Sequence, residues 1–459
     1  MPSFIALDLG TAFIKGAVLD TDGLRFNHLQ RLPFPEPLPN LPPLFCEIDP
    51  GQIVAAVRAL IGQLLPHAPQ CAGVVMCGQM GGLVLVTERG QPLSNYISWR
   101  DQRLLMPHPS GAGTYFDVLL QRLSFDDRRQ LGQEVRPGLP LSFLFWFVET
   151  QQLSLSRPIA ATLTDFVIAH LTGTPPGLEV TQAVGALNLE TLDWHYAVFA
   201  KLGLEQVRWP VLKPLTEPVS CLQINGQSLP CYAPVGDHQC ALAGALIGYR
   251  ELSLNISTGS QASLLTPRFD PGDYQTRPFF DGRFLNTITH IPAGRSLNAL
   301  FDLLCELARV QGAERAGLWS YITQAASTTS DTDLKVNLAF FPGPVGNHGA
   351  IANIREGNLT VGQLFYAAFR NMADNYYACA MRLSPNEDWQ TLIFSGGLAQ
   401  KFDLLRQMIL DRFQCNHRMC ASPEDTLLGL LAFGLVISGQ ASTVEAASEI
   451  LRTHEQQFI

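Results

Sequence analysis

The stretch FIALDLGTAFIKGAVLD, residues 4–20, decides the fold. It is apolar and β-prone up to Asp8, turns at Gly10 and Thr11, and returns as a second strand. A carboxylate at the end of a buried strand is costly unless it has a partner. Hydrated magnesium is such a partner, the turn can aim donors at phosphate oxygens, and Lys15 can neutralise a phosphate. Taken alone, a simple hairpin explains the same residues.

The stretch ELSLNISTGSQASLLT, residues 251–266, repeats this pattern of strand, small-residue turn and strand. Thr258 and Gly259 lie in its turn, where small hydroxylated residues allow close approach of a phosphate. The repetition predicts two like domains that face each other across a cleft. We place their boundary between residues 1–245 and residues 246–459.

The rest of the chain alternates strands with helices, which predicts an α/β layer architecture. A helix is expected over 51–66 and a buried strand over 71–78. A strand should run through 229–237. Further helices are expected within 141–171 and over 296–311, 361–383, about 400–413 and 425–438, with strands over 391–395 and 416–420.

Composition excludes several classes of protein. Of 459 residues, 47% are hydrophobic and 15% charged, which suits large cores and excludes disorder. The net charge is -9 without a basic block, so no nucleic-acid partner is expected. The longest apolar run, 427–438, is about 12 residues, short of the roughly 20 needed to span a membrane. No signal-peptide pattern opens the sequence, and a cytoplasmic protein is expected.

The ten cysteines have irregular spacing, which is typical of reduced thiols. Cys415 and Cys420 flank His417 and could be metal ligands. Because a second ligand pair is missing, a surface turn explains them better.

Asp237 lies in VGDHQCALAG, at the mouth of an apolar strand and directly before a helix. Phosphoryl transfer needs alignment, charge stabilisation and an acceptor for the hydroxyl proton. A well-placed aspartate meets the last need. By local pattern alone, Asp237 is equally well explained as a helix N-cap.

FSGGLAQ, residues 394–400, connects a strand to a helix. Gly396 and Gly397 would let the backbone pass close to a ligand, at a helix N-terminus that favours anions. A tight strand-to-helix connection is the alternative.

Polar groups also follow strands in the first half, in GQM and SWRDQR. Gln79, Met80, Trp99 and Asp101 could hydrogen-bond or flank a polyol. The alternative for Asp101 is a local ion pair with Arg103.

As an ordered set, these stretches resemble the FGGY carbohydrate kinases of the actin-like ATPase superfamily. The resemblance covers nearly the whole chain and implies an α/β fold of two actin-like (ribonuclease H-like) domains around a central cleft. It implies ATP and Mg²⁺ as cofactors, with DLGTAFIK and NISTGSQ as phosphate loops and FSGGLAQ as the adenosine motif. Gly429, in LLGLLAFG, would permit close helix packing.

The resemblance also assigns roles to individual residues. Asp237 would be the catalytic base, and Asp8 would hold magnesium through water. The remaining assignments are phosphate contacts at Gly10, Thr11, Lys15, Thr258 and Gly259, adenosine contacts at Ser395, Gly396 and Gly397, and substrate contacts at Gln79, Met80, Trp99, Asp101 and Asp237.

Within that family, the chain is most similar to the sedoheptulokinases. GDHQC, LNIST, GRSLNALFDLL (294–304) and TLTDFVIAHL (162–171) carry this likeness. A ketose acceptor is implied, with sedoheptulose converted to sedoheptulose 7-phosphate by a monomer or homodimer. Gly81 stands where xylulokinase-like members have a histidine, which weakens a xylulose assignment.

Three alternatives remain open. The first is a pentulokinase for ribulose or xylulose. The second is a non-catalytic sugar-sensing protein, which need not keep both Asp8 and Asp237. The third is an ATPase without a sugar substrate, which GQM and SWRDQR disfavour.

Overall fold

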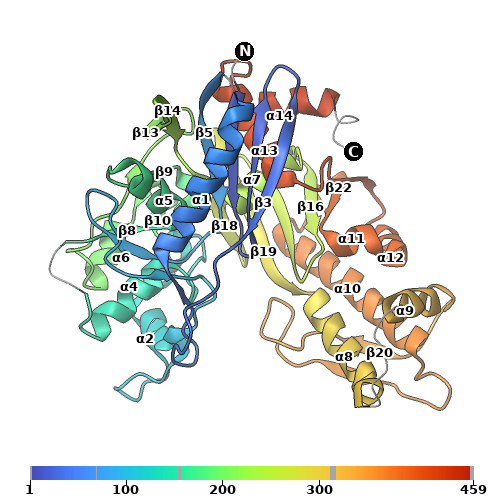
Figure 1. The fold of residues 1–459 in the computed structure, drawn as a ribbon. Coiled ribbons are helices and arrows are strands. Elements are labelled where there is room, and N and C mark those ends of the chain that lie inside the picture. Colours follow the sequence, from blue (N-terminus) through green and yellow to red (C-terminus); the bar gives the residue numbers. More distant parts are fainter. Residues whose placement is uncertain (1–2, 69, 154–156, 311–316, 455–459) are drawn as a thin grey trace.

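The computed structural model describes residues 3–68, 70–153, 157–310 and 317–454. Two large mixed sheets dominate this part of the chain (Figure 1). The first sheet has the order β13 (Pro218–Ile224), β14 (Gln227–Tyr232), β5 (Cys71–Gly78), β1 (Ser3–Leu9), β2 (Phe13–Asp20), β3 (Arg25–Pro33), with β15 (Val235–Gly236) paired to β5. The second has the order β18 (Gln275–Pro278), β19 (Phe284–Pro292), β17 (Gly259–Thr266), β16 (Glu251–Asn255), β22 (Thr391–Ser395), β23 (Asn416–Met419).

The two sheets share one topology around their opening strands. Strand β1 pairs antiparallel with β2 and parallel with β5. Strand β16 likewise pairs antiparallel with β17 and parallel with β22. The expected second copy of the opening pattern is therefore confirmed, and the fold is the predicted two-domain α/β arrangement.

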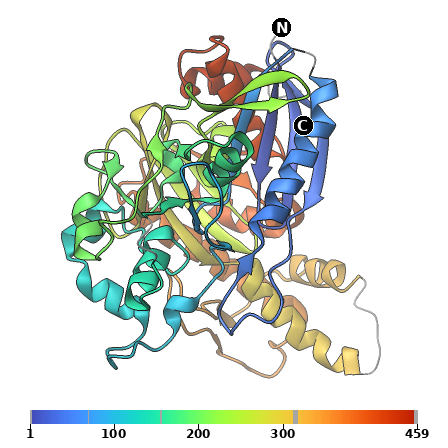
Figure 2. The same cartoon turned by 60° about the vertical axis from the view of Figure 1, so that its left-hand side comes forward.

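The central strands of the first sheet, β1, β2 and β5, are buried on both faces, which explains their nearly continuous apolar sequences. Alternate residues of β1 point to opposite sides. Ile5 and Leu7 pack with α1 (Pro50–Leu64) and α5 (Leu163–Thr172), while Phe4 and Ala6 pack with α7 (Asp237–Gly244), α13 (Asp425–Ile437) and α14 (Val444–Thr453). Both views show α1 lying along the N-terminal strands (Figures 1 and 2).

The second sheet packs on one side against α8 (Gly294–Val310), α9 (Leu318–Ser327), α10 (Val361–Leu383) and α12 (Asp403–Phe413). Its other side contributes Leu265, Leu285 and Ile393 to the core that holds α7 and α13. That core is thus shared by both sheets.

The contact between α7 and α13 is unusually close because both helices carry a glycine there. A Cβ at Gly429 would lie 2.1 Å from the Cys240 carbonyl oxygen, and a Cβ at Gly244 would lie 1.8 Å from the Asp425 carbonyl oxygen. The close packing expected at Gly429 is confirmed.

A separate apolar core lies in the part of the chain between β5 and β13. It is built around α2 (Tyr115–Arg122), α4 (Pro140–Glu149) and α6 (Tyr196–Lys201). The short helix α3 (Phe125–Gln130) follows α2 in the chain. The smaller elements are β4 (Glu47–Ile48), β6 (Val84–Val86), β7 (Tyr96–Ile97), β8 (Ile159–Ala161), β9 (Gly177–Leu178), β10 (Leu187–Asn188), β11 (Asp193–Trp194), β12 (Val211–Leu212), β20 (Lys335–Asn337), β21 (Ala350–Ala352) and α11 (Gly397–Lys401).

The elements expected from the sequence differ from the structure in one place that matters to the site. The single strand expected to reach Asp237 is wrong, because it divides into β14 and β15. Pro234, between them, has no N–H to donate to a ladder. Its carbonyl oxygen instead accepts a hydrogen bond from the Glu179 N–H.

The boundary at residues 245 and 246 stays a prediction. The C-terminal helices α13 and α14 lie beside the N-terminal strands at the top of Figure 1, so the two ends of the chain meet in one core. In the described ranges, no helix combines the length and apolarity needed to cross a membrane.

Candidate active site

A cavity of about 360 Å³ lies beside Asp237. Its wall combines residues from the N-terminal half of the chain with residues of the second sheet. The lining consists of Thr11, Gln79, Met80, Trp99, Gln102, Arg136, Pro137, Gly138, Leu139, Asp237, His238, Gln261, Arg277, Thr289 and His290. The cavity therefore brings together Asp237, Gln79, Met80, Trp99 and Thr11, all of which the sequence had singled out.

Asp237 is the first residue of α7, and the N-cap position belongs to Gly236. The alternative interpretation of Asp237 as a helix N-cap is therefore wrong. Burial and the nearby charge of Asp8 raise the pKa of Asp237 to about 7. A carboxyl group with this pKa can accept a proton near neutral pH.

Asp8 lies at the end of β1 with only 5% of its surface exposed. Its Oδ2 accepts a hydrogen bond of 2.8 Å from the Thr426 hydroxyl, and Lys15 Nζ lies 3.7 Å from the same oxygen. Burial raises the pKa of Asp8 in spite of these two partners. The partners expected for a buried carboxylate are thus supplied in part by the C-terminal helix α13.

Lys15 does not stand free beside the turn. Its ammonium group donates a hydrogen bond of 2.9 Å to Glu424 Oε2, and Arg31 bonds the other oxygen of Glu424. The predicted contact of Lys15 with a phosphate stays a prediction. In such a contact, Lys15 would be shared with Glu424.

Asp425 is a site residue that sequence reasoning missed. It begins α13, and burial together with the charge of Asp8 raises its pKa to about 7. The available signal was the acidic pair Glu424 and Asp425, directly before the most apolar helix of the chain. The charge of Asp8 thus raises the pKa of both Asp237 and Asp425, and the charge of Asp425 adds to the effect on Asp237.

These carboxyl groups suit a hydrated cation better than a bare one. Among the described residues, no group of three or more His, Cys, Asp or Glu side chains is arranged to hold a metal ion. Magnesium keeps several waters and takes few protein carboxylates when it binds with phosphates. Asp8 and Asp425 are the residues that would hold such an ion through water.

The second turn is open where the first is crowded. A Cβ added at Gly259 would meet nothing within 4 Å, and the Thr258 carbonyl oxygen accepts a hydrogen bond of 2.9 Å from the Arg295 N–H. Gly10, in the first turn, has the Phe13 carbonyl oxygen 3.1 Å from its Cβ position. The geometry leaves room for a ligand at the second turn.

Gly396 and Gly397 differ in what they require. Gly396 has a φ of 86°, and its Cβ would lie 2.5 Å from the Ile256 carbonyl oxygen, so only glycine fits there. Gly397 begins α11 and has open space where a Cβ would be. Ser395, at the end of β22, is buried.

A second cavity, of about 680 Å³, lies next to these glycines. It is bounded by α8, α9, α11 and the residue before α12. Its lining is Gly294, Leu297, Asn298, Trp319, Ser320, Thr323, Gln324, Leu398, Lys401 and Phe402. Its mixed apolar and polar wall suits a flat heterocyclic ring with polar edges.

Trp99 and Gln79 shape the wall of the cavity beside Asp237. The indole N–H of Trp99 donates a hydrogen bond of 3.2 Å to the Thr11 hydroxyl. The Gln79 Nε2 group is buried, and no described residue accepts its hydrogen bonds. An unpartnered buried donor in a cavity wall points to a ligand that accepts from it.

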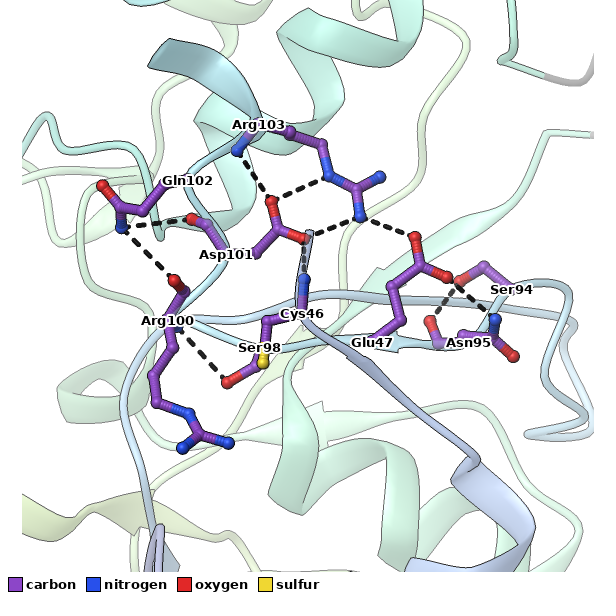
Figure 3. Close-up of polar contacts among 9 residues, drawn as sticks. All are labelled: Cys46, Glu47, Ser94, Asn95, Ser98, Arg100, Asp101, Gln102 and Arg103. Atoms are coloured by element: carbon purple, nitrogen blue, oxygen red, sulfur yellow. Dashed lines mark hydrogen bonds and ion pairs between the residues drawn. The ribbon is translucent and has the colours of Figure 1, made fainter. Parts of the chain in front are cut away.

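Asp101 requires a correction. Its two oxygens accept hydrogen bonds from the Arg103 N–H, from the Arg103 guanidinium and from the Cys46 N–H, at 2.6–2.9 Å (Figure 3). Arg103 Nη2 also bonds Glu47, at 2.6 Å. These bonds use the acceptor capacity of a buried carboxylate outside the cavity wall. The alternative of a local ion pair is confirmed, and Asp101 positions its loop rather than a substrate.

A charged group centred on Glu134 is the second feature that sequence reasoning missed. Arg277 Nε donates to Glu134 Oε1 at 2.6 Å, and Arg136 Nη2 lies 2.7 Å from Glu134 Oε2. Arg277 Nη1 lies 2.7 Å from His238 Nδ1, which connects the group to the residue after Asp237. In the sequence, RPGLP and QTRP gave no local sign of this association.

Cys415 and Cys420 form no disulfide with a described residue. With His417 they form no metal-ligating group in the part of the chain that the structure describes.

The strand pairing that the two sheets repeat defines an actin-like α/β architecture. Residues 3–230 match the model described as "FGGY family of carbohydrate kinases, N-terminal domain". The chain belongs to the FGGY family of carbohydrate kinases.

Two curated relatives illustrate the range of the family. A glycerol kinase of Saccharolobus islandicus (strain M.14.25 / Kamchatka #1) is 23% identical over 282 residues, which cover 56% of this chain and 51% of that protein. The chain thus spans about half the length of that relative. The gluconokinase of Bacillus subtilis (strain 168) is 21% identical over 480 residues, which cover 97% and 90% of the two proteins.

Solved structures share the fold over almost the whole chain. Gluconate kinase from Lactobacillus acidophilus superposes with a TM-score of 0.84 at 18% identity, covering 98% of this chain and 92% of that one. Plasmodium falciparum glycerol kinase with ADP superposes with a TM-score of 0.81 at 14% identity, with the same coverage.

Proposed function

We propose that this protein is an ATP-dependent carbohydrate kinase, which transfers the γ-phosphoryl group to a hydroxyl of a small polyhydroxylated acceptor. The observation that carries the proposal is Asp237, a carboxyl group with a pKa of about 7 in the wall of a cavity beside the first phosphate-type turn. Membership of a carbohydrate kinase family supports the same activity.

The chemistry needs one proton acceptor and good alignment. The acceptor hydroxyl oxygen attacks the γ-phosphorus, the bond from this phosphorus to the β–γ bridging oxygen breaks, and ADP leaves. Asp237 takes the hydroxyl proton. Magnesium, when bound, neutralises the phosphate charge, and Asp8 and Asp425 would orient it through water. Closure around the site would exclude water, a competing acceptor.

The nucleotide is assigned to the second half of the chain. The adenine ring would occupy the cavity of about 680 Å³, with the ribose passing Gly397. Phosphates would extend between the turn at Gly10 and Thr11 and the turn at Thr258 and Gly259. The ADP bound by the Plasmodium falciparum structure of the same fold supports a nucleotide as the ligand.

The acceptor is a separate question. The sequence resemblance favours a ketose, sedoheptulose first, with ribulose or xylulose as the alternative. The names of the relatives add glycerol and gluconate as acceptor classes. A sugar sensor without catalysis is disfavoured because both Asp8 and Asp237 are present.

The test is an acceptor panel with fixed ATP and Mg²⁺ and coupled detection of ADP. The panel contains ketoses, polyols and sugar acids of three to seven carbons. We expect ADP release that depends on one acceptor class and on Mg²⁺. Release that is the same with and without every acceptor would identify an ATPase, and no release at all would favour the sensor.

A further inference from the structure

Acidic and basic groups both lie at the cavity beside Asp237. Burial and the charges of Asp8 and Asp425 raise the pKa of Asp237, and the charge of Arg277 partly opposes them. Two guanidinium groups, from Arg136 and Arg277, share the single carboxylate of Glu134. Arg136, Arg277 and Asp237 all line the cavity, whereas Glu134 lies behind the arginines.

One positive charge remains after the pairing with Glu134. Burial would keep Glu134 protonated, but the charges of Arg136 and Arg277 outweigh it and hold its pKa below the usual value. Glu134 is therefore an anion, and it balances only one of the two arginines. The charge of a guanidinium cannot be removed by deprotonation in a protein.

The neighbouring histidines do not change this balance. Burial and the charge of Arg277 hold the pKa of His238 well below its usual value. Burial and Arg136 lower the pKa of His290 in the same way. Both rings are neutral at neutral pH, and each adds a polar edge without charge.

Unpartnered atoms in the cavity wall point to a ligand rather than to a closed structural cluster. The Arg136 Nε, Gln79 Nε2 and Gln261 Oε1 atoms are buried, and no described residue forms a hydrogen bond with them. Arg136 belongs to the cavity wall, with 32% of its side chain exposed. Such groups are normally satisfied by a bound molecule or by water.

We propose that the acceptor is a sugar acid, whose hydroxyl lies at Asp237 and whose carboxylate is bound by Arg136 beside Arg277. A planar guanidinium binds a carboxylate through two parallel hydrogen bonds, which fixes the direction of the chain as well as its position. The carboxylate also supplies the charge that Glu134 leaves unbalanced. A neutral ketose of the same length would leave one partly buried arginine charge without an anionic partner. This inference rests on the proposed kinase function and narrows its acceptor class.

The test compares matched acceptors and one pair of variants. Five- and six-carbon aldonates are compared with ketoses and polyols of the same lengths, at saturating ATP and Mg²⁺. For the wild type, we expect kcat/KM to favour the aldonates. In Arg136→Gln, we expect KM for the aldonate to rise about 10- to 100-fold, the loss of one charged hydrogen-bonded contact, with KM for ATP unchanged. Arg136→Lys should recover part of the loss, since it keeps the charge.

Arg129→Gln is the matched control. Arg129 has 30% of its side chain exposed and bonds Glu190 at 2.6 Å, nearly as Arg136 bonds Glu134, but it lies outside the cavity beside Asp237. It should leave KM for the aldonate unchanged. If Arg136→Gln fails to fold, the wild-type panel and Arg136→Lys still decide the question.

The outcomes separate the two proposals. Preference for a neutral acceptor, with ADP release intact, overturns the sugar-acid inference and leaves the kinase standing. A rise in KM for ATP instead of the aldonate also overturns it, because the arginines would then bind the nucleotide. Absence of acceptor-dependent ADP release removes the proposed function itself.

Discussion

The turn between β1 and β2 and the turn between β16 and β17 have the same strand pairing, but the residues beside the first are charged and those beside the second are neutral. In the first, Asp8 pairs across the strands with Lys15, and its parallel neighbour is Cys77. In the second, Asn255 stands at the corresponding place opposite Gln261, and its parallel neighbour is Ser395. The duplicated topology therefore carries charge in one copy and neutral amides in the other.

The C-terminal part of the chain increases this difference in charge, because residues at the start of α13 lie beside the first turn. Thr426 bonds Asp8, and Glu424 bonds Lys15. The second turn instead contacts a backbone group, the Arg295 N–H, which donates to the Thr258 carbonyl oxygen at 2.9 Å, and a Cβ at Gly259 would meet nothing within 4 Å. From this contrast we propose different roles for the two copies. The carboxylates of the first would accept the proton and hold the cation, and the backbone of the second would contact the nucleotide.

The largest effect is expected from a variant that removes a carboxylate from the group formed by Asp8, Asp237 and Asp425. Asp237→Asn keeps the shape of the side chain and cannot accept the hydroxyl proton, so we expect kcat to fall by about 10²- to 10⁴-fold. Binding of ATP should be largely kept, because the nucleotide is assigned to other residues. Coupled ADP release and equilibrium titration with a fluorescent ATP analogue measure the two quantities.

The matching variant at the second turn replaces Asn255, which occupies the place of Asp8 and carries no charge. Asn255→Ala should lower kcat less than tenfold and act mainly through KM for ATP. Near-normal kcat in Asp237→Asn would mean that Asp237 is not the base. Equal losses in both variants would contradict the different roles proposed for the two copies.

The fold could be predicted well because hydrophobic periodicity and turn residues are visible within short stretches of sequence. The strands around Asp8 and Asn255 carried their own signals, and the helix over 361–383 was expected with the bounds that the structure has. Close packing at Gly429 was expected from the family resemblance of LLGLLAFG rather than from a local pattern.

The charged part of the site was harder to predict because it is assembled over long distances. Asp425 lies 417 residues after Asp8, yet the charge of Asp8 raises the pKa of Asp425, and both charges raise the pKa of Asp237. Arg277 and Glu134 are 143 residues apart in the chain. Asp101 was predicted to contact the substrate because its loop is polar, but the sequence does not show that Arg103 and the Cys46 N–H use its oxygens.

The pH dependence of turnover tests whether Asp8, Asp237 and Asp425 work as a coupled group. Asp237 must be ionised to act as a base, and burial with the charge of Asp8 raises its pKa to about 7. The rate should therefore fall as pH drops below about 7, by about tenfold per unit, and level off above it. Measurement of kcat/KM for the acceptor between about pH 5.5 and 9, at saturating ATP and Mg²⁺, gives the profile.

Asp8→Asn sharpens this experiment. It removes one of the charges that raise the pKa of Asp237, so the acidic limb of its residual activity should move to lower pH. A limb that stays in place would assign the ionisation to another group. A profile without a limb would contradict the role of Asp237 as a base near its pKa.

The smallest effects are expected from glycine variants near the second turn, where the space around the backbone rather than charge decides what fits. Gly396→Ala forces a Cβ to within 2.5 Å of the Ile256 carbonyl oxygen at a φ of 86°, so we expect a loss of about 1–3 kcal/mol in the free energy of unfolding and a KM for ATP raised severalfold. Gly397→Ala meets open space, so stability should stay near the wild-type value, and any rise in KM for ATP would come from contact with the nucleotide itself. Denaturant unfolding and ATP titration of kinase activity separate the two effects. Neither variant should move the acidic limb of the pH profile, because neither glycine lies among the carboxylates that set it. A shift of that limb in Gly397→Ala would show that the two turns share their electrostatics after all.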